Sequence, residues 1–507
     1  MELELNSQHL EFFETVVDTT LYQEETAESI VPDSCPDIAR VVSVSGIPCL
    51  TERMVQDGRG ELAGQVKTTL LYRPEGAGSL RRIEVPVPFR CTISGAGISS
   101  TAKIVAIPRL QAADTRVLNP RKILIRVNLA IGVQIFTPQI QRFFSNISCD
   151  ENAGIEQLEE RCATYFAADI QEKSFTFSDE LPIGGRGGAE ELLDQCVDFH
   201  CNESKIIGNK LIFKGDADLH LLYRVGDSME GADYKLPFSQ ILEVAELGET
   251  TDCALELQLT GLECALGGDN GNLVYVTFEV LAQSVVWEQR EWTVIRDFYS
   301  TSAQSEAEYC PCQFYQRLGE ESDHQSIREL IETERAVKTV LDTSLKLGAV
   351  TRSREGGQVL LSTAANLQIL YLGEDDEFYS ASHQVTVNSR FDCPEDGACM
   401  AQCFSEGDVF ATPVSGGVEV RFAVSFRALL ASRRSMVILK AGKLKAWDES
   451  GQNEVRPSIV LRQMEGDESL WDVAKSCGTT RAVILSANKL ENESDCRGHM
   501  LLIPRVR

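Results

Sequence analysis

The sequence predicts a mainly β fold: three tandem modules of the β-sandwich or barrel-like type, each with one short helix, followed by a small tail of different character. Residues 58–73 end in Leu-Leu-Tyr-Arg, and the same ending recurs in residues 208–224, so that Tyr72 and Tyr223 lie 151 residues apart. A weaker copy ends at Tyr371, 148 residues after Tyr223. A period of this length indicates repetition of whole domains rather than a solenoid of small units.

Each repeated stretch has the pattern of a strand pair. In residues 208–224, Leu211 and Phe213 share one face, and a second alternating run ends at Tyr223. Apolar residues at every second position are typical of half-buried strands. The three tyrosines occupy matching positions in this pattern, so we expect them to pack inside their modules.

The last strand of each module repeats with the same spacing. Its apolar positions are Ile123, Ile125, Val127 and Leu129 in the first module, Val274, Val276, Phe278 and Val280 in the second, and Val418, Val420, Phe422, Val424 and Phe426 in the third. Modules are therefore expected at residues 1–150, 151–305 and 306–445. The third module is degenerate, because it lacks the Pro–Phe pair found at residues 88–89 and 237–238.

One short helix is expected in each module. In the first, Ser34 or Cys35 can cap a helix whose first position is Pro36, and its apolar face would carry Ile38, Val41 and Val42. In the second, residues 189–199 supply the helix. In the third, residues 326–334 place Ile327, Leu330 and Ile331 on one helical face.

Charge and hydropathy exclude several classes of protein. The 507 residues include 76 acidic and 48 basic side chains, which gives a net charge of -28. This field disfavours a nucleic-acid partner and suits a partner with basic patches. The first residues contain neither a basic nor an apolar segment typical of a secretory signal. The apolar runs, such as residues 129–136, have strand length, so no membrane helix is expected.

The sixteen cysteines are expected to be reduced and mostly buried thiols of a cytoplasmic protein. Three groups could be considered as metal ligands: Cys310 with Cys312; Cys393 with Cys399 and Cys403; and Cys196 with His200 and Cys201. None has the two correctly spaced pairs of a zinc site, so separate thiols are the favoured interpretation and no metal is expected.

No catalytic signature is found. The chain contains no nucleophile elbow, Walker loop or His-Glu-x-x-His helix. Its Gly-rich loops, residues 95–97 and 184–188, do not open a βαβ unit and are interpreted as turns rather than phosphate sites. We therefore expect a protein without enzymatic activity and without a cofactor. An unrecognised enzyme with a groove between the modules is the least favoured alternative.

The tail follows a polar linker, residues 446–457, which ends at Pro457. Residues 458–507 predict the order βααβ. The first helix can be capped by Asp467 or Ser469, and the second by Thr479 or Thr480. Leu470, Val473 and Ala474 mark the buried face of the first helix. About fifty residues are near the lower limit for an independent core.

Trp471 has two interpretations. It lies about 100° from the buried face of its helix, which predicts partial exposure. It could lie across the small core of its own module. Alternatively, it could be a recognition anchor, because aromatic residues dominate binding hot spots.

The tail resembles the LysM module. The matching residues are Gly466–Asp467, the run from Ser469 to Lys475, Asn488, and Gly498 with residues 501–504. The sequence departs from the pattern by one extra residue, Glu468, and by an acidic second loop. The resemblance implies partner or glycan binding by Gly466, Asp467, Ser469, Leu470, Trp471 and Asn488.

The three repeats resemble SPOCS domains, and the repeats with the tail resemble SipL-type spore-coat morphogenetic proteins. This resemblance implies a non-enzymatic adaptor in the mother-cell cytoplasm, at the forespore surface. Its implied partner is the ATPase that polymerises as the basement layer of the coat. The alternative is a LysM protein that binds peptidoglycan, through N-acetylglucosamine polymers of the wall or spore cortex. The absence of a secretory signal and the acidic loop count against this alternative.

Overall fold

A computed structural model describes residues 3–76, 79–149, 153–183, 188–226, 228–268, 271–446, 458–464, 468–496 and 498–505. Strands make up 79% of it, with two short helices, so the prediction of a mainly β protein is confirmed. The expected linker lies outside the described residues, except for residue 446. The described residues contain no helix that is both long enough and apolar enough to span a membrane.

The first unit contains six strands in two sheets. They are β1 (Glu4–Ile30), β2 (Ile38–Gln56), β3 (Arg59–Pro74), β4 (Arg81–Ser94), β5 (Lys103–Asn119) and β6 (Lys122–Ser148). One sheet has the order β2-β3-β4, and in the other β6 lies between β1 and β5. All of these pairs are antiparallel.

The second unit has the same strand order. Its strands are β7 (Ile155–Pro182), β8 (Glu191–Ile207), β9 (Lys210–Val225), β10 (Ser228–Glu243), β11 (Thr250–Gly267) and β12 (Leu273–Ser300). Strand β9 is the centre of one sheet, and β12 lies between β7 and β11 in the other. A single pair, Phe13 with Ala167, joins this second sheet to that of the first unit.

The third unit follows the same order with one interruption. Its strands are β13 (Gln304–Glu332), β14 (Val337–Leu347), β15 (Thr351–Glu355), β16 (Gln358–Gly373), β17 (Phe378–Asp392), β18 (Ala398–Val414) and β19 (Gly417–Lys445). Strands β14 and β15 both pair with the central strand β16, whose other neighbour is β17. Strand β19 lies between β13 and β18.

The two sheets of each unit bury one common hydrophobic core, and the sheets are not closed. Tyr72, Tyr223 and Tyr371 are buried in these three cores, as expected from their matching positions. The leucine before each tyrosine lies on the opposite face of its strand, outside the core of its own unit. Leu71, Leu222 and Leu370 belong to one cluster that the three units share. The repeated motif therefore places its tyrosine in the core of one unit and its leucine in the cluster between the three units.

The prediction that residues 208–224 form a strand pair is wrong. They lie mostly in the single strand β9, whose neighbours on either side are β8 and β10. Gly215 and Ala217 are buried and continue the inward face between Phe213 and Leu219. Small residues in the middle of the stretch therefore mark a close approach of neighbouring strands, not a turn.

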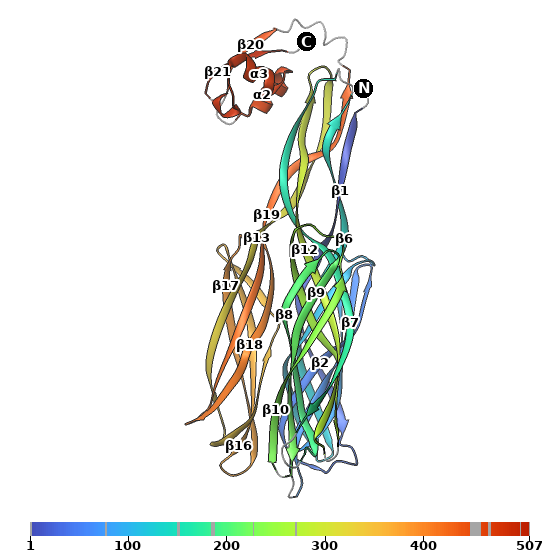
Figure 1. The fold of residues 1–507 in the computed structure, drawn as a ribbon, viewed down its shortest axis with the longest axis vertical. Helices are drawn as coiled ribbons and strands as arrows, with labels where there is room; N and C mark the ends of the chain where they lie inside the picture. The colour runs from blue at the N-terminus through green and yellow to red at the C-terminus, as the bar shows by residue number, and fades with distance from the viewer. Residues whose placement is uncertain are drawn as a thin grey trace.

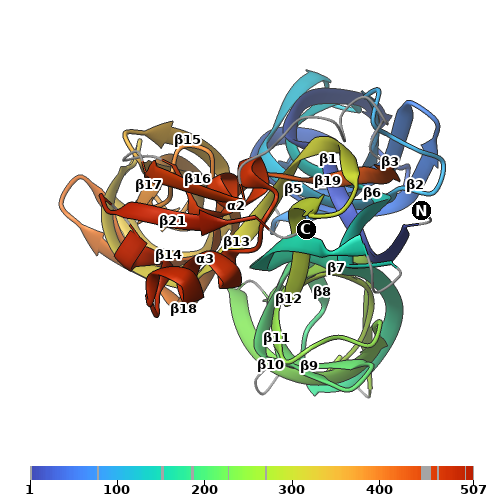
Figure 2. The same cartoon turned by 90° about the horizontal axis from the view of Figure 1, so that it is seen from above.

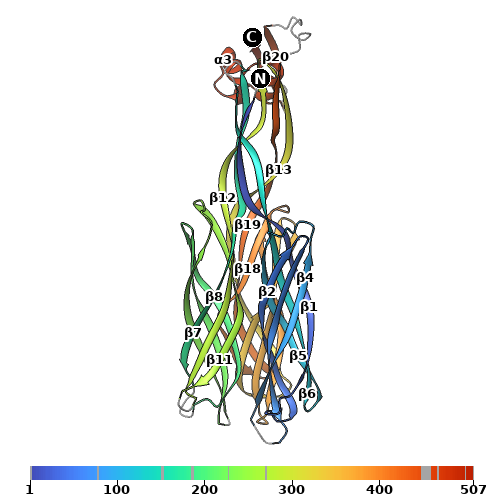
Figure 3. The same cartoon turned by 90° about the vertical axis from the view of Figure 1, so that its right-hand side faces the viewer.

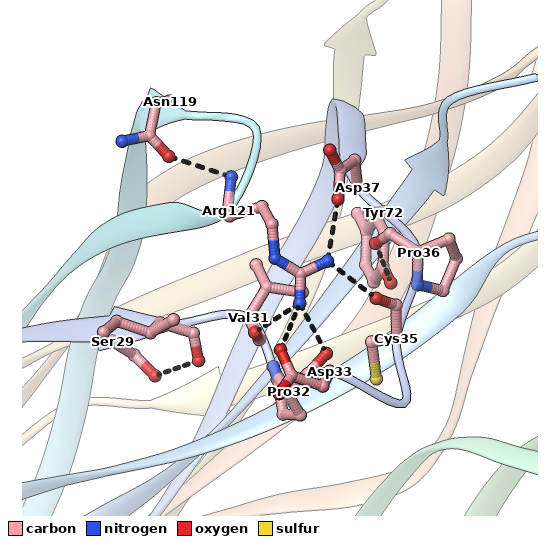
Figure 4. A network of polar contacts seen from close by, with 11 residues as sticks. Ser29, Val31, Pro32, Asp33, Cys35, Pro36, Asp37, Tyr72, Asn119 and Arg121 are labelled. Atoms are coloured by element: carbon pink, nitrogen blue, oxygen red, sulfur yellow. Dashed lines mark hydrogen bonds and ion pairs between the residues drawn. The ribbon is translucent and has the colours of Figure 1, made fainter.

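The prediction of one helix in each module is also wrong. Residues 38–42 lie in β2, residues 191–199 in β8, and residues 326–332 in β13. In the first unit, residues 31–37 form a loop that Arg121 holds (Figure 4). The Arg121 guanidinium donates to the carbonyls of Val31, Pro32 and Cys35 and to the carboxylates of Asp33 and Asp37. Tyr72 donates to the Pro36 carbonyl at 3.0 Å.

These contacts remove the need for helical hydrogen bonds. Buried backbone carbonyls must find donors, and in this loop side chains provide them. Pro36 is therefore a loop residue, and neither Ser34 nor Cys35 caps a helix.

The three units stand side by side around a common axis (Figure 2). The first and last strands of each unit are much longer than the rest and continue beyond the shorter strands as a narrow stem (Figures 1 and 3). We define the stem by two clusters to which all three units contribute. Their buried residues are Leu10, Phe143, Cys162, Phe166, Val294, Cys312, Phe314, Met436 and Ile438 in one, and Ile147, Ala153, Ile295, Phe298, Ala303, Leu439 and Leu444 in the other. The tail lies at the far end of this stem (Figure 3).

Candidate functional site: the tail at the end of the stem

The tail contains two strands and two helices in the order β20 (Ile459–Gln463), α2 (Leu470–Cys477), α3 (Arg481–Asn488) and β21 (Met500–Pro504), with a short 3-10 turn, η2 (Glu493–Cys496), before β21. Strands β20 and β21 pair antiparallel. Its core contains Leu470, Val473, Ala474, Ile484, Leu501 and Ile503. The expected buried face of α2 is thus present.

Both helices start at a side-chain cap. Ser469 caps α2: its hydroxyl accepts from the Asp472 amide, and the Asp472 carboxylate accepts from the Ser469 amide. Thr480 caps α3 by accepting from the Val483 amide at 3.2 Å. Helix α2 ends at Gly478, which has a φ of 65°, a conformation that glycine adopts without strain. These local signals fix where each helix begins.

Trp471 is not partly exposed, as its helical position had suggested. It is 3% exposed, and its ring meets that of Tyr299 edge-on at a centroid distance of 4.9 Å. Its indole Nε1 donates to Asp297 Oδ2 at 2.7 Å. Both partners belong to β12 of the second unit, so Trp471 is an anchor within the chain itself. The local sequence pattern around Trp471 does not predict these contacts, because their partners belong to another unit.

Asp297 is the centre of the contact between the tail and the stem. Its carboxylate accepts from Lys475 Nζ at 2.7 and 2.8 Å, from Trp471, and from the Tyr309 hydroxyl of the third unit. Burial opposes its ionisation, but these donors outweigh burial and hold the pKa of Asp297 below its usual value. Tyr299 completes the contact by donating to the Thr479 carbonyl at 2.7 Å.

Asn488 has a structural role in the tail. Its amide nitrogen donates to the carbonyls of Ile484 and Leu502, and its oxygen accepts from the Leu502 amide at 2.8 Å. These bonds tie α3 to β21. The side chain thus uses its main hydrogen-bonding groups within the tail.

The other predicted site residues that the structure describes, Ser469 and Leu470, do not share one surface. Leu470 is 2% exposed in the core, whereas Ser469 is exposed but occupied as a cap. Gly466 and Asp467 lie outside the described residues. The structure therefore places Leu470, Trp471 and Asn488 mainly as supports of the tail and its docking.

A different surface of the tail is apolar and open. Ile459, Leu461 and Met500 are 54%, 67% and 62% exposed. They lie on the outer face of β20 and β21, where Leu461 pairs with Leu502 and Gln463 with Met500. Large apolar side chains gathered on one face are typical of an interaction surface. Residues 459–461 are three consecutive apolar residues, so no alternation of apolar and polar residues in the sequence marks this outward face.

The described residues offer little for metal or redox chemistry. They contain no group of three or more His, Cys, Asp or Glu side chains arranged to hold a metal ion. The cysteines other than Cys149 are free thiols in the structure. Burial raises the pKa of the Cys49 thiol to about 11 and that of Cys253 to about 12, which keeps both protonated and unreactive.

Residues 189–266 match the model of a family described as SipL, SPOCS domain. The match covers the sheet of β8, β9 and β10 together with nearly all of β11. It indicates a sporulation-related protein. No curated protein matches the chain.

Proposed function

We propose that this chain is a non-enzymatic adaptor of spore-coat assembly in the mother-cell cytoplasm. In this proposal the three units form a SPOCS scaffold at the forespore surface. The tail is a LysM-like head that captures the polymerising ATPase of the basement layer. The observation that carries the proposal is the open apolar face of the tail, displayed at the far end of a long stem.

The repeated strand order supports extending the SPOCS assignment beyond residues 189–266. The same two sheets, with the same central strands, occur in all three units. The motif positions at Tyr72, Tyr223 and Tyr371 are buried in all three. We therefore assign the other two units to the same domain family as the unit that matches by sequence.

The outer face of β20 and β21 is the part of the tail that we assign to capture. Trp471 is occupied by the stem, whereas Ile459, Leu461 and Met500 face solvent. Burying one large apolar side chain contributes about 1.5–3 kcal/mol, so three of them can support a specific contact. The described residues of β20 and β21 on this face are uncharged, so the face itself adds no charge repulsion to a contact made by a strongly acidic protein.

The first prediction concerns this face. Removing residues 458–507 should abolish capture of the basement-layer ATPase in a pulldown, while the three units stay folded. In the full chain, Leu461→Asp should weaken capture at least about tenfold, because an unpaired charge would be buried at the contact. Ile30→Asp is the matched control, since Ile30 is 72% exposed on the first unit and should have no effect.

Two results would contradict these assignments separately. Full-strength capture by the truncated chain would show that the tail does not bind the ATPase. Capture that depends on the tail but is unchanged by Leu461→Asp would show that the tail binds the ATPase through a surface other than the outer face of β20 and β21. A parallel pulldown with insoluble peptidoglycan tests the glycan alternative, which predicts retention on that matrix and none on the ATPase.

The second prediction concerns Trp471. Trp471→Ala should destabilise the tail by roughly 3–5 kcal/mol, because a buried ring is lost from a small core. It should also loosen the docking on Asp297. Thermal melting and circular dichroism must accompany the binding assay. A folded, docked Trp471→Ala protein with capture reduced by roughly 2 kcal/mol would instead indicate a direct hot spot.

A further inference from the structure

The stem carries a socket for the tail, which we define as Leu158, Asp297 and Tyr299 of the second unit with Tyr309 of the third. The socket combines an ion pair to Lys475, an acceptor for the Trp471 indole, and an aromatic edge-to-face contact. Leu158 packs against the same cluster as the tail core. Such a set favours one helix face in one orientation, because the Trp471 indole and the Lys475 ammonium must both reach the carboxylate of Asp297.

The tail and the socket form separately in the fold. Helices α2 and α3 have their own caps, and most of the tail core comes from residues 464–503. Asp297 and Tyr299 are positioned by the pairing of β12 with β7, where Asp297 lies opposite Leu158 and Tyr299 opposite Glu156. Each half is therefore held mainly by contacts within itself.

The two halves are connected through residues 447–457. A contact between two surfaces of one chain that are joined through a connecting segment can close within a chain or between chains. The choice depends on concentration. A short connection gives an effective concentration on the order of millimolar, so closure within one chain wins in dilute solution. Docking between chains becomes competitive when many copies are packed at a local concentration comparable to this effective concentration.

We propose that the socket accepts the tail of a second copy of this chain, so that docking within one molecule competes with exchange between molecules. This interaction is independent of any capture of the ATPase. It provides a scaffold protein with a self-association contact that is concealed in the isolated molecule. A dense layer of copies would engage it.

Charge exchange across the Asp297–Lys475 pair tests the proposal in the full chain. Lys475→Glu disables the tail and leaves the socket intact. Asp297→Lys disables the socket and leaves the tail intact. Each variant alone should release its tail, because like charges then face each other. In the mixture, the unchanged tail of the Asp297→Lys chain can meet the unchanged socket of the Lys475→Glu chain. The two substituted halves also carry opposite charges there, as they do when both changes are made in one chain.

Tyr299 is the reporter of docking, because it is 2% exposed with the tail in place. Hydroxyl-radical labelling of Tyr299 should be at least threefold faster in each single variant than in the natural chain, and should slow again in the double variant. Sedimentation of each single variant at about 100 µM should show monomers, because the tail and the socket of that variant carry like charges. An equimolar mixture should form a one-to-one dimer in which Tyr299 of the Lys475→Glu chain is protected again.

Three results would overturn the proposal. Tyr299 labelling that is unchanged in both single variants would show that the ion pair does not hold the tail. Released variants that stay monomeric after mixing would show that the socket acts only within a chain. A dimer that forms equally well from Asp297→Lys alone would place the association elsewhere. Unchanged circular dichroism of all variants excludes misfolding as the cause of release.

Discussion

His220 illustrates how single residues join the units. It lies on β9 of the second unit, with Nδ1 2.6 Å from Asp233 and Nε2 2.9 Å from Asp342 of the third unit. Burial disfavours the charged imidazolium, but the hydrogen bonds and charges of the two carboxylates outweigh burial and raise the pKa of His220 to about 9. The residue is therefore a cation at neutral pH and bridges two units.

A pH-dependent stability follows. An unfolded histidine has a pKa of about 6.5, so the contribution of His220 is complete below that pH and is lost as the pH rises towards 9. We expect His220→Gln to lower stability by on the order of 1–3 kcal/mol at pH 6, discounted for a side chain that is 28% exposed. Denaturation midpoints of both proteins should converge by pH 9.5. A difference that does not change with pH would contradict this role.

At the scale of elements, a glycine and a phenylalanine are paired across two strands in the first two units. Gly64 lies opposite Phe89, and Gly215 lies opposite Phe238. A methyl group on Gly215 would come within 2.0 Å of the His200 carbonyl oxygen and 2.8 Å of the Phe238 ring. The aromatic ring covers the space that a side chain would fill. In the third unit the corresponding pair is Thr363 and Val387.

This pairing explains why the Pro–Phe signal and the glycine disappear together from the third repeat. It also yields a prediction. Gly215→Ala should destabilise the second unit by roughly 1–3 kcal/mol, because the strands or the ring must shift. Gly132→Ala is the matched control, since its nearest atom is an ordinary 3.9 Å away. Equal melting temperatures for the two variants would refute the pairing.

The same scale shows what the sequence could and could not predict. Strand periodicity and helix caps are local signals. The caps that form, Ser469 and Thr480, each come from a predicted pair of candidates. The three segments predicted as helices are strands. Their sequences lack the alternation of a strand, because neighbouring apolar residues are buried against different partners. Leu192 lies in the core of the second unit, whereas Leu193 packs with Leu222 and Leu370 between units. A strand buried on both faces loses its simple alternation and can imitate a helical pattern.

The candidate site shows the same division. Local pattern gave the tail's order of elements and its core. It could not give the docking of Trp471, because Asp297 and Tyr299 lie far away in the sequence. The sequence also does not distinguish the outward residues Ile459 and Leu461 from Val460 between them, because all three are apolar.

For the whole molecule, the sixteen thiols give a chemical test of the fold. Most are buried or half-buried, and burial raises the pKa of Cys403 to about 12. We expect slow reaction of nearly all thiols with a disulfide reagent in the native protein, and sixteen reactive thiols after denaturation without reductant. Recovery of several stable disulfides from native cells would contradict this and would favour the extracellular glycan alternative.

The long outer strands also determine how the molecule would respond to mechanical load. Each unit begins and ends at the same end of the stem, where Glu4 pairs with Ser148, Ile155 with Ser300, and Gln304 with Lys445. Hydrogen bonds in antiparallel pairs run perpendicular to the strands. A pull applied at these ends separates the two strands one pair at a time, as a zipper opens, instead of loading all pairs together. The molecule should therefore yield at low force and extend gradually, which would let a layer tethered through its tip stretch before it tears.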